Sequence, residues 1–401
     1  MKRILFVDDE PNILDGLRRA LRPQRDRWQM AFASSGPQAL EMLASESCDM
    51  IVSDMRMPGM DGAALLASVC ERHPAVIRII LSGYTDLTAF MCAVPVAHQF
   101  FLKPCDPLLL REAIDHQTSV ADRYGYPPVA ELVGSLRALP VAPHAYQELR
   151  REVAESHPSL DHLVKVVTSD VGVSTRALQL AHSAFFGQRQ DIADIRAAVA
   201  RLGSDILGHL VLAADTLRSF EPATAIHGFD IDDFQRHSHL VGTIAERVGG
   251  AGLQAHVLYK AGLLHDVGKL VLADRAPDRF GQAQEIARAE GRPSHQVEEE
   301  MFGVSHAEIG AYLLGLWGLP TAIVEAVAHH HHPERASDDQ RPAAAAVYLA
   351  DYLARLPETQ GITRGTEAPD AHILALLGGP AMWSKWTEMA VNAARLDAQL
   401  A

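Results

Sequence analysis

The chain has 401 residues, a formal net charge of −14 at pH 7 and a hydrophobic content of 48%. That length allows two or three domains with packed cores, and the negative charge argues against direct DNA binding, which needs clustered Lys and Arg. No charge-free apolar run approaches bilayer length, so we expect a soluble, cytoplasmic protein without a membrane partner.

Acidic residues follow two apolar runs near the amino terminus, where we expect buried strands to end. Residues 4–7 are one run, and they lead into Asp8 and Asp9; residues 50–52 lead into Asp54. The carboxyl ends of parallel strands converge on one crevice of an α/β sheet, where three carboxylates would repel one another without a cation. Mg²⁺ is the expected cation, because it prefers oxygen ligands.

A hydroxyl and an amine follow two further apolar runs. Ser82 comes after residues 76–81, and Lys103 comes after residues 100–102. A phosphoryl group moving onto Asp54 develops charge that the metal, the hydroxyl and the amine could neutralise. Single Asp or Lys residues at strand ends are ordinary solvated positions, but four such motifs at successive strand ends favour a phosphorylation site.

Residues 1 to about 120 closely resemble the receiver domain of two-component response regulators. The resemblance is carried by the paired aspartates, IVSDMRMPGMDG, ILSGY and the Lys-Pro pair at 103–104. It implies an α/β flavodoxin-like fold with a parallel five-stranded sheet, and Asp54 as the phosphoacceptor. It also implies that a sensor histidine kinase is a partner.

The same resemblance implies roles for the residues around the phosphoacceptor. The Mg²⁺ ligands would be Asp8, Asp9, Asp54 and the carbonyl of Arg56. Ser82 and Lys103 would bind the phosphoryl oxygens, and Phe100 lies where the family keeps its switch aromatic. Residues 93–97 depart from the Ala-Gly-type turn that is usual there, which affects the output face rather than the chemistry.

The rest of the chain has a helical pattern. Residues 107–123 predict a last receiver helix, and the Gly and Pro residues at 125–128 break it, because neither continues a helix. Apolar residues then recur at spacings of three and four, with short Gly or Pro breaks, which predicts helices. The expected division is a receiver over 1–122, a linker over 123–130, an all-α domain over 131–335 and a helical extension over 336–401.

Histidines and aspartates in this helical part could form one metal site. They are His237, His265, Asp266, His306, the run His329 to His332, and Asp351. Side chains from separate helices can project into one interior site, and imidazole with carboxylate suits Fe, Mn or Zn. Lys269 lies one turn after Asp266 on the same face, where it could contact a phosphate held by the metal. A lone His on a helix is more often an ordinary polar residue, but the pair at 265–266 follows an apolar run and so borders a core.

The motif LLHDVGK is the signature of HD-type phosphohydrolases, and its surroundings resemble the HDOD domain of bacterial signalling proteins. That likeness covers about residues 131–335 and is carried by LRALPVAP, LVKVVTSDVGVSTRALQLAHSAFFG, FGVSHAEIGAYLLGLWGLP and AVAHHHHP. It implies an HD-related fold that is commonly regarded as non-catalytic, because many HDOD domains have lost metal ligands.

The likeness to HD-GYP phosphodiesterases implies that this chain keeps more metal ligands than many HDOD domains do. The matching positions are His237, His265, Asp266, His306, His330 and Asp351. His239 is an available substitute for His237, because only one of the two can face inward. No Gly-Tyr-Pro segment follows the His run, and the Gly-Tyr-Pro at 125–127 precedes the HD pair.

Two functions remain open. In the first, phosphorylation of Asp54 shifts the receiver and exposes or reorients an HDOD surface that binds metal and an unknown downstream protein, without turnover. In the second, the protein is a metal-dependent phosphodiesterase, in which a metal-activated water attacks a cyclic dinucleotide or another phosphoester while Lys269 steadies the phosphate. We favour the first, because the Gly-Tyr-Pro segment tied to cyclic di-GMP cleavage is missing; a homodimer is left open.

Overall fold

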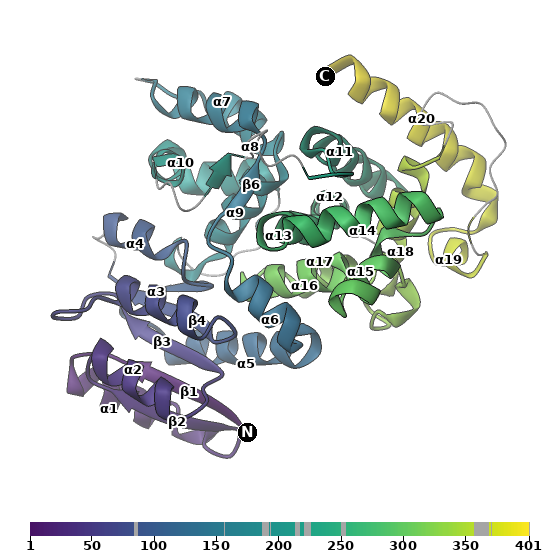
Figure 1. The fold of residues 1–401 in the computed structure, drawn as a ribbon. Helices are drawn as coiled ribbons and strands as arrows, with labels where there is room; N and C mark the ends of the chain where they lie inside the picture. The colour runs from purple at the N-terminus through teal and green to yellow at the C-terminus, as the bar shows by residue number, and fades with distance from the viewer. Residues whose placement is uncertain are drawn as a thin grey trace.

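The computed structural model describes residues 1–83, 87–155, 157–186, 192, 194–212, 217–219, 226–249, 254–356, 369 and 371–400. An α/β domain at the amino terminus is followed by a helical domain, and the two chain termini lie at opposite ends of the molecule (Figure 1). No helix within these residues is long and apolar enough to cross a membrane.

The amino-terminal domain is built on five parallel strands in the order β2-β1-β3-β4-β5. The strands are β1 (Lys2–Val7), β2 (Trp28–Ala33), β3 (Met50–Asp54), β4 (Ile77–Ser82) and β5 (Gln99–Leu102). The helices are α1 (Pro11–Ala20), η1 (Arg22–Gln24), α2 (Gly36–Ser45), α3 (Gly62–Arg72), α4 (Leu87–Ala93) and α5 (Pro107–Tyr124). All residues of β3 and β4 are buried, as apolar strands covered by helices on both faces should be. The predicted flavodoxin-like sheet is confirmed.

The linker expected over residues 123–130 is shorter in the structure. Helix α5 continues through Tyr124, and α6 (Pro127–Gly134) begins two residues beyond Gly125. Proline is tolerated in the first turn of a helix, where its missing N–H would have no helical partner. The two prolines therefore start α6 instead of extending a loop.

The helical domain is mostly helical, as expected, but it contains one short pair of strands. Its helices are α7 (Pro143–Val153), α8 (Leu160–Thr168), α9 (Val171–His182), η2 (Ala184–Phe186), α10 (Ile195–Leu212), α11 (Ile231–Val248), α12 (Ala255–Leu264), α13 (Val267–Arg275), α14 (Pro277–Glu290), α15 (Ser294–Phe302), α16 (His306–Leu316), α17 (Thr321–Ala328), η4 (Pro333–Arg335), α18 (Arg341–Ala354), α19 (Ala371–Leu376), η5 (Pro380–Met382) and α20 (Trp383–Leu400). Strands β6 (Leu139–Val141) and β7 (Leu217–Ser219) pair in parallel.

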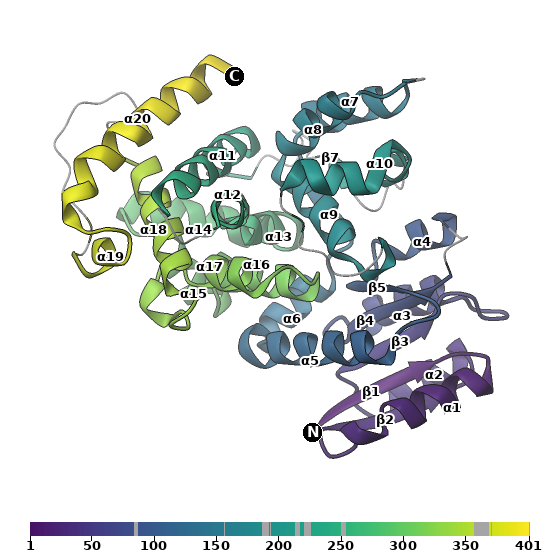
Figure 2. The same cartoon turned by 180° about the vertical axis from the view of Figure 1, so that it is seen from behind.

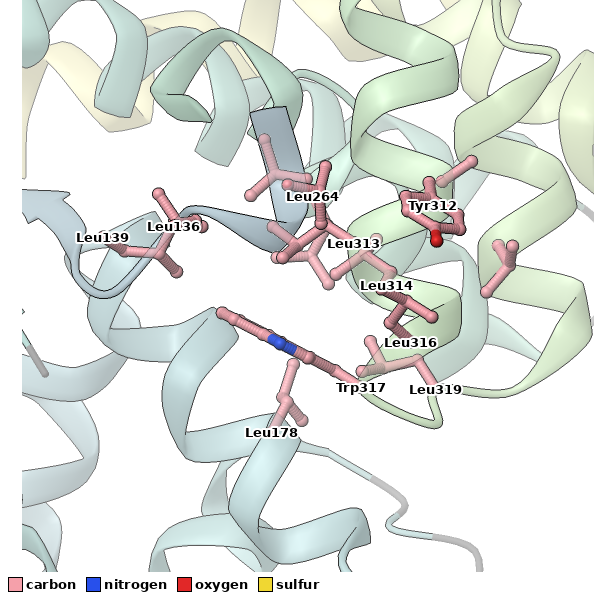
Figure 3. Packing of buried hydrophobic residues seen from close by; sticks show 14 of the residues in the cluster. Leu136, Leu139, Leu178, Leu264, Tyr312, Leu313, Leu314, Leu316, Trp317 and Leu319 are labelled. Atoms are coloured by element: carbon pink, nitrogen blue, oxygen red, sulfur yellow. The ribbon is translucent and has the colours of Figure 1, made fainter. Parts of the chain in front are cut away.

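The two domains pack directly against each other. Helix α16 of the helical domain lies along α5 and α6 in both views of the ribbon (Figures 1 and 2). At the end of α16, the ring of Trp317 lies near Leu178 of α9 and near Leu136 and Leu139 (Figure 3). The guanidinium of Arg176 covers that ring, 4.4 Å from its centroid. The receiver and the helical domain thus share one continuous apolar core.

Candidate functional site

The residues expected to carry phosphorylation meet at the carboxyl end of the sheet. Asp8 follows β1, Asp54 ends β3, and Lys103 follows β5. The Lys103 ammonium donates to Asp8 Oδ2 at 2.7 Å and forms an ion pair with Asp54. The backbone N–H of Arg56 donates to Asp54 Oδ2 at 3.0 Å. A single cation therefore bridges the two carboxylates that the sequence placed at separate strand ends.

The electrostatics of this end of the sheet suit a bound cation. Burial raises the pKa of Asp54 above its ordinary value, and the Lys103 ammonium offsets only part of that rise. Burial by itself lowers the pKa of Lys103, but hydrogen bonds to Asp54 and Asp8 raise it above its usual value. The lysine thus stays charged between the acids. Asp9 lies partly exposed beside Asp8, so three carboxylates offer the oxygen donors that Mg²⁺ prefers.

Two further predicted residues lie on the strands next to this site. Ser82 is buried at the end of β4, and its hydroxyl donates to the carbonyl of Gly83 at 3.4 Å. Phe100 is fully buried in β5, three residues before Lys103. The structure therefore places Ser82 and Phe100 on the two strands that lead from the acidic site toward the helical domain.

The histidines and aspartates of the helical domain converge on one interior cluster. They come from α11, the junction of α12 and α13, the start of α16, the end of α17, and α18. Three sets of possible ligand atoms lie within 4.8 Å of one another: His237, His265 and Asp351; His265, Asp266 and His330; His306, His330 and His331. Because neighbouring sets share members, we call all seven residues the histidine cluster.

Asp266 lies at the centre of the histidine cluster. Its Oδ1 is 2.9 Å from His306 Nε2 and 3.8 Å from His330 Nε2, and its Oδ2 is 3.3 Å from His265 Nε2. A glycine permits this close approach: a Cβ built on Gly268 would lie 2.0 Å from the His306 carbonyl oxygen. Helix α13 can therefore press against the start of α16 only because residue 268 has no side chain.

Hydrogen bonds from Nδ1 orient three of the imidazole rings. The Nδ1 atoms of His265 and His330 donate to backbone carbonyls at 2.7 Å, and His306 Nδ1 donates to the buried carboxylate of Glu298 at 2.5 Å. A proton fixed on Nδ1 leaves the Nε2 lone pair free to act as a ligand. All three rings thus present Nε2 to the centre of the histidine cluster.

Some of these inward atoms lack the hydrogen bonds that burial normally demands. The Nε2 atoms of His265 and His330 are buried and make no hydrogen bond to any described residue. Nearly all buried polar atoms in folded proteins have a partner. Ligand atoms left without one, around a buried carboxylate, fit a transition-metal ion bound by imidazole and carboxylate.

The pKa shifts of Asp351 and His330 suit metal binding. Burial alone raises the pKa of Asp351, but Arg355 and His237 bring that pKa well below its usual range. Burial, together with neighbouring His265 and His306, lowers the pKa of His330 well below its usual range. Asp351 is therefore ionised and His330 neutral at neutral pH, which are the states that bind metal. At His265, by contrast, burial lowers the pKa but Asp266 and Asp351 raise it to about 9, so this ring must release a proton when a metal binds.

The sequence analysis named His331 only as part of the run His329 to His332, and it missed Arg355 and Glu298. His331 Nε2 lies 3.0 Å from His306 Nε2, and Arg355 donates from Nε to Asp351 Oδ1 at 2.8 Å. Arg355 follows Asp351 by four residues on one helix, a spacing that could have revealed it. Glu298 lies eight residues before its partner, and no local pattern signalled it. His237, rather than the substitute His239, pairs with Asp351, with 2.9 Å between Nε2 and Oδ1.

Two cavities reach the histidine cluster. One has a volume of about 480 Å³ and is lined by His237, Asp266 and Lys269, among others. The Lys269 ammonium, which was expected to contact a phosphate, donates to Asp266 Oδ2 at 2.6 Å. The other cavity has a volume of about 380 Å³ and lies between His331 and Tyr124 at the end of the receiver helix α5.

Comparisons with known proteins match both halves of the chain to families. A response regulator receiver domain matches residues 4–115, and an HDOD domain matches residues 139–333. An uncharacterized protein of Treponema pallidum (strain Nichols) is 27% identical over 198 residues, which is 49% of this chain and 38% of that protein. The hydrogenase transcriptional regulatory protein HoxA of Cupriavidus necator is 35% identical over 127 residues, which is 30% of this chain and 26% of HoxA. The chain thus spans well under half the length of these relatives.

One solved structure resembles most of the chain. The MmoQ response regulator from Methylococcus capsulatus str. Bath is 19% identical and covers 62% of this chain and 98% of its own, with a TM-score of 0.50. At that identity the likeness shows the fold alone.

Proposed function

Because the chain is a two-component response regulator in which a receiver domain precedes an HDOD domain, we propose that phosphorylation of Asp54 changes how the receiver holds the HDOD domain. The HDOD domain then changes its binding of a downstream protein. A sensor histidine kinase supplies the phosphoryl group. The observation that carries the proposal is the direct packing of the HDOD domain on the receiver beside Phe100.

An aromatic stack connects the two domains at this point. Phe90 of α4 lies against Phe100, with ring centroids 4.8 Å apart. On its other side, Phe90 stacks on Phe185 of the HDOD domain at 4.2 Å. The hydroxyl of Ser183, also in the HDOD domain, donates to the carbonyl of Phe100 at 3.1 Å. A rearrangement of Phe100 cannot occur in so densely packed a region without moving these partners.

Receiver side chains also bind the end of α16. Gln99 Nε2 and Gln117 Nε2 each donate to the carbonyl of Leu316 at 3.0 Å. The last carbonyls of a helix have no partner within the helix, so these two amides act as a cap supplied by the other domain. The contact therefore depends on the position of β5 and α5 relative to α16.

Phosphorylation of Asp54 can change the contact between the receiver and the HDOD domain, because β4 and β5 end beside Asp54. A phosphoryl group on Asp54 offers three acceptor oxygens, and the Lys103 ammonium and the Ser82 hydroxyl are the donors at hand. When bound by Asp8, Asp9 and Asp54, Mg²⁺ supplies further positive charge to those oxygens. Lys103 must leave its bridge between the two aspartates, and that displacement moves the end of β5, which carries Phe100.

Removing the stacked ring of Phe185 is expected to uncouple the domains. In the wild type, phosphorylation with a small phosphodonor and Mg²⁺ should increase backbone hydrogen–deuterium exchange at the ends of α9 and α16. Phe185→Ala should still accept phosphate but show little further exchange, because the contact is already weakened. Loss of a buried Phe side chain costs roughly 3 to 5 kcal/mol of folding free energy.

Phe302→Ala provides the matched control for the loss of stability. Phe302 is a similarly buried ring of the HDOD domain that does not touch the receiver's aromatic stack. It should destabilise the fold to a comparable extent but retain the phosphorylation-dependent change. If wild-type exchange near Phe185 is the same with and without phosphate, the receiver does not signal through this contact.

A second function, metal-dependent phosphoester hydrolysis, is favoured by the convergence of the seven residues of the histidine cluster and by the cavity of about 480 Å³ that His237 and Asp266 line. His237, His265, Asp266, His306, His330, His331 and Asp351 would hold one or two Fe, Mn or Zn ions. A metal ion, when bound, supplies Lewis-acid activation of water and of a phosphoryl oxygen. Lys269 and Arg355 hold Asp266 and Asp351 in place and add positive charge at the cavity wall.

Cyclic di-GMP is expected to be hydrolysed slowly or not at all. No Gly-Tyr-Pro segment follows the His run, although the ligand residues are present. Protein supplied with Mn²⁺ or Fe²⁺ and phosphorylated on Asp54 should therefore release little linear product in a chromatographic assay. Rapid hydrolysis that disappears in His265→Ala would contradict this prediction and promote the enzymatic function over the non-catalytic one.

A further inference from the structure

The loop over residues 329–337, which we call the His loop, is fixed at both ends by Glu325 of α17. The backbone carbonyl of Glu325 accepts from the N–H of His329, the first residue after the helix, at 3.0 Å. The Glu325 carboxylate accepts from the hydroxyl and the backbone N–H of Ser337, at 2.8 and 3.0 Å. The His loop therefore starts and ends at one side chain, and it holds both members of the His run that belong to the histidine cluster.

The His loop supplies two residues of that cluster. His330 belongs to two of the three sets of converging ligand atoms, and His331 Nε2 lies 3.0 Å from His306 Nε2. The ring of His331 also stacks on His295 of α15, with 3.9 Å between the ring centroids. The loop borders the cavity of about 380 Å³, which leaves it room to shift on that side. The hydrogen bonds to Glu325 thus help to hold both rings where they meet their neighbours.

The receiver holds Glu325 in turn. Arg123, at the end of α5, forms an ion pair with the Glu325 carboxylate, whose side chain is only 4% exposed. Removing one partner of a buried ion pair is costly, because the remaining charge is left without full compensation. The next residue, Tyr124, lies beside His329, with ring centroids 6.3 Å apart. The end of the last receiver helix therefore contacts both Glu325 and the His loop.

The other end of α5 lies next to the phosphorylation site. The helix begins four residues after Lys103, which bridges Asp8 and Asp54. Its 18 residues span about 27 Å, at a rise of 1.5 Å per residue. A rigid helix of this kind can carry a displacement from one site to another. A movement of Lys103 toward a phosphoryl group on Asp54 therefore has a direct path to Arg123.

We infer that the receiver sets the metal affinity of the histidine cluster through Arg123 and Glu325, and that phosphorylation of Asp54 lowers this affinity. When Arg123 withdraws, Glu325 loses its charged partner, and the His loop is held less firmly. Both are positioning residues, since neither belongs to the three sets of ligand atoms. Because thermodynamic coupling is reciprocal, phosphorylation should also be less favourable in the metal-loaded protein. The inference rests on the proposed function, because it uses the same movement of the receiver.

The test measures the Zn²⁺ affinity of the full-length protein by competition with a chromophoric chelator, before and after phosphorylation by a small phosphodonor with Mg²⁺. His330→Ala reports the Zn²⁺ binding that does not involve the histidine cluster. Phosphorylation should weaken the affinity of the cluster about tenfold in the wild type. Arg123→Gln should weaken it about tenfold without phosphorylation and remove most of the further change. Arg123→Lys, which keeps a cation beside Glu325, should restore most of the affinity.

Arg137→Gln is the matched control for the loss of an ion pair between the domains. Arg137 follows α6 and pairs with Glu71 of the receiver helix α3 at 2.7 Å. Its side chain is 40% exposed, against 52% for Arg123. Arg137→Gln should change neither the Zn²⁺ affinity nor its response to phosphorylation. Asp54→Asn should keep the wild-type affinity and show no response to the phosphodonor.

Three results would overturn the inference. The first is an equal Zn²⁺ affinity of the phosphorylated and unphosphorylated wild type; the proposed function would still stand if hydrogen–deuterium exchange at α16 increased on phosphorylation. The second is an Arg123→Gln protein with wild-type affinity and a wild-type response, which would place the coupling elsewhere. The third is a wild type that binds no more Zn²⁺ than His330→Ala does, which would remove the metal site as well.

Discussion

Asp54→Asn is expected to abolish phosphorylation of the protein by a small phosphodonor in the presence of Mg²⁺. The amide has nearly the same shape as the carboxylate, so the fold should be preserved, but its oxygen is a poor nucleophile toward phosphorus. Asp54 is the carboxylate that Lys103 and the N–H of Arg56 both contact at the end of β3. Intact-protein mass spectrometry should show one added phosphoryl group on the wild type and none on the variant.

Two further variants test whether the loss of phosphorylation is specific to Asp54. Asp15→Asn changes an exposed aspartate of α1 that forms an ion pair with Arg18, and it should be labelled like the wild type. Lys103→Ala should retain some labelling, because Asp54 and the other acids remain, but it should lose the increase in hydrogen–deuterium exchange at α16. Equal labelling of Asp54→Asn and wild type would show that the phosphoacceptor lies elsewhere.

His330→Ala is expected to reduce the transition-metal content of the purified protein severely. Metal affinity should fall more than 100-fold, since even the loss of a residue that only supports a ligand costs about 10 to 100-fold. His330 belongs to two of the three sets of converging ligand atoms, and its Nε2 is buried without a hydrogen bond. Elemental analysis after equilibration with Mn²⁺, Fe²⁺ or Zn²⁺ should give one or two ions per wild-type chain.

A histidine outside the cluster provides the control. His162 lies at the surface of α8, where its ring contacts Glu148 and Glu152, and His162→Ala should leave the metal content unchanged. Glu298→Gln should give an intermediate loss, because Glu298 accepts from Nδ1 and from the backbone N–H of His306 but belongs to none of the three sets of ligand atoms. A wild-type protein that takes up no metal, or a His330→Ala protein that takes up as much, would refute the metal site.

The sequence by itself determined four of the five strands of the receiver, whereas the fifth strand, β2, was implied only by the resemblance to receiver domains. The apolar runs that precede Asp8, Asp54 and Ser82 are strands of the structure, to within two residues at their ends. Parallel strands all carry their carboxyl ends to the same edge, so the position of a residue along its own strand is enough to predict its neighbours. Because of this rule, the residues at the strand ends were enough to predict the phosphorylation site.

Less could be predicted for the histidine cluster. His265 and Asp266 could be recognised because an apolar run precedes them. The six ligands expected from the likeness to HD-GYP phosphodiesterases do lie together. The choice of His331 rather than His329 or His332 was not visible, because each residue at a helix end turns its side chain in a different direction. Which one faces His306 depends on the packing of α16 against α17.

The contact between the domains was decided by the tertiary structure alone. Nothing local to Phe185 or Leu316 indicates that one stacks on Phe90 and the other accepts from Gln99, because these partners are separated by long stretches of chain. Glu298 lies only eight residues before His306, but their contact also depends on how α15 packs against α16. Local propensity and periodicity specify where helices and strands form, whereas the shape of two packed surfaces depends on all the side chains that meet there at once.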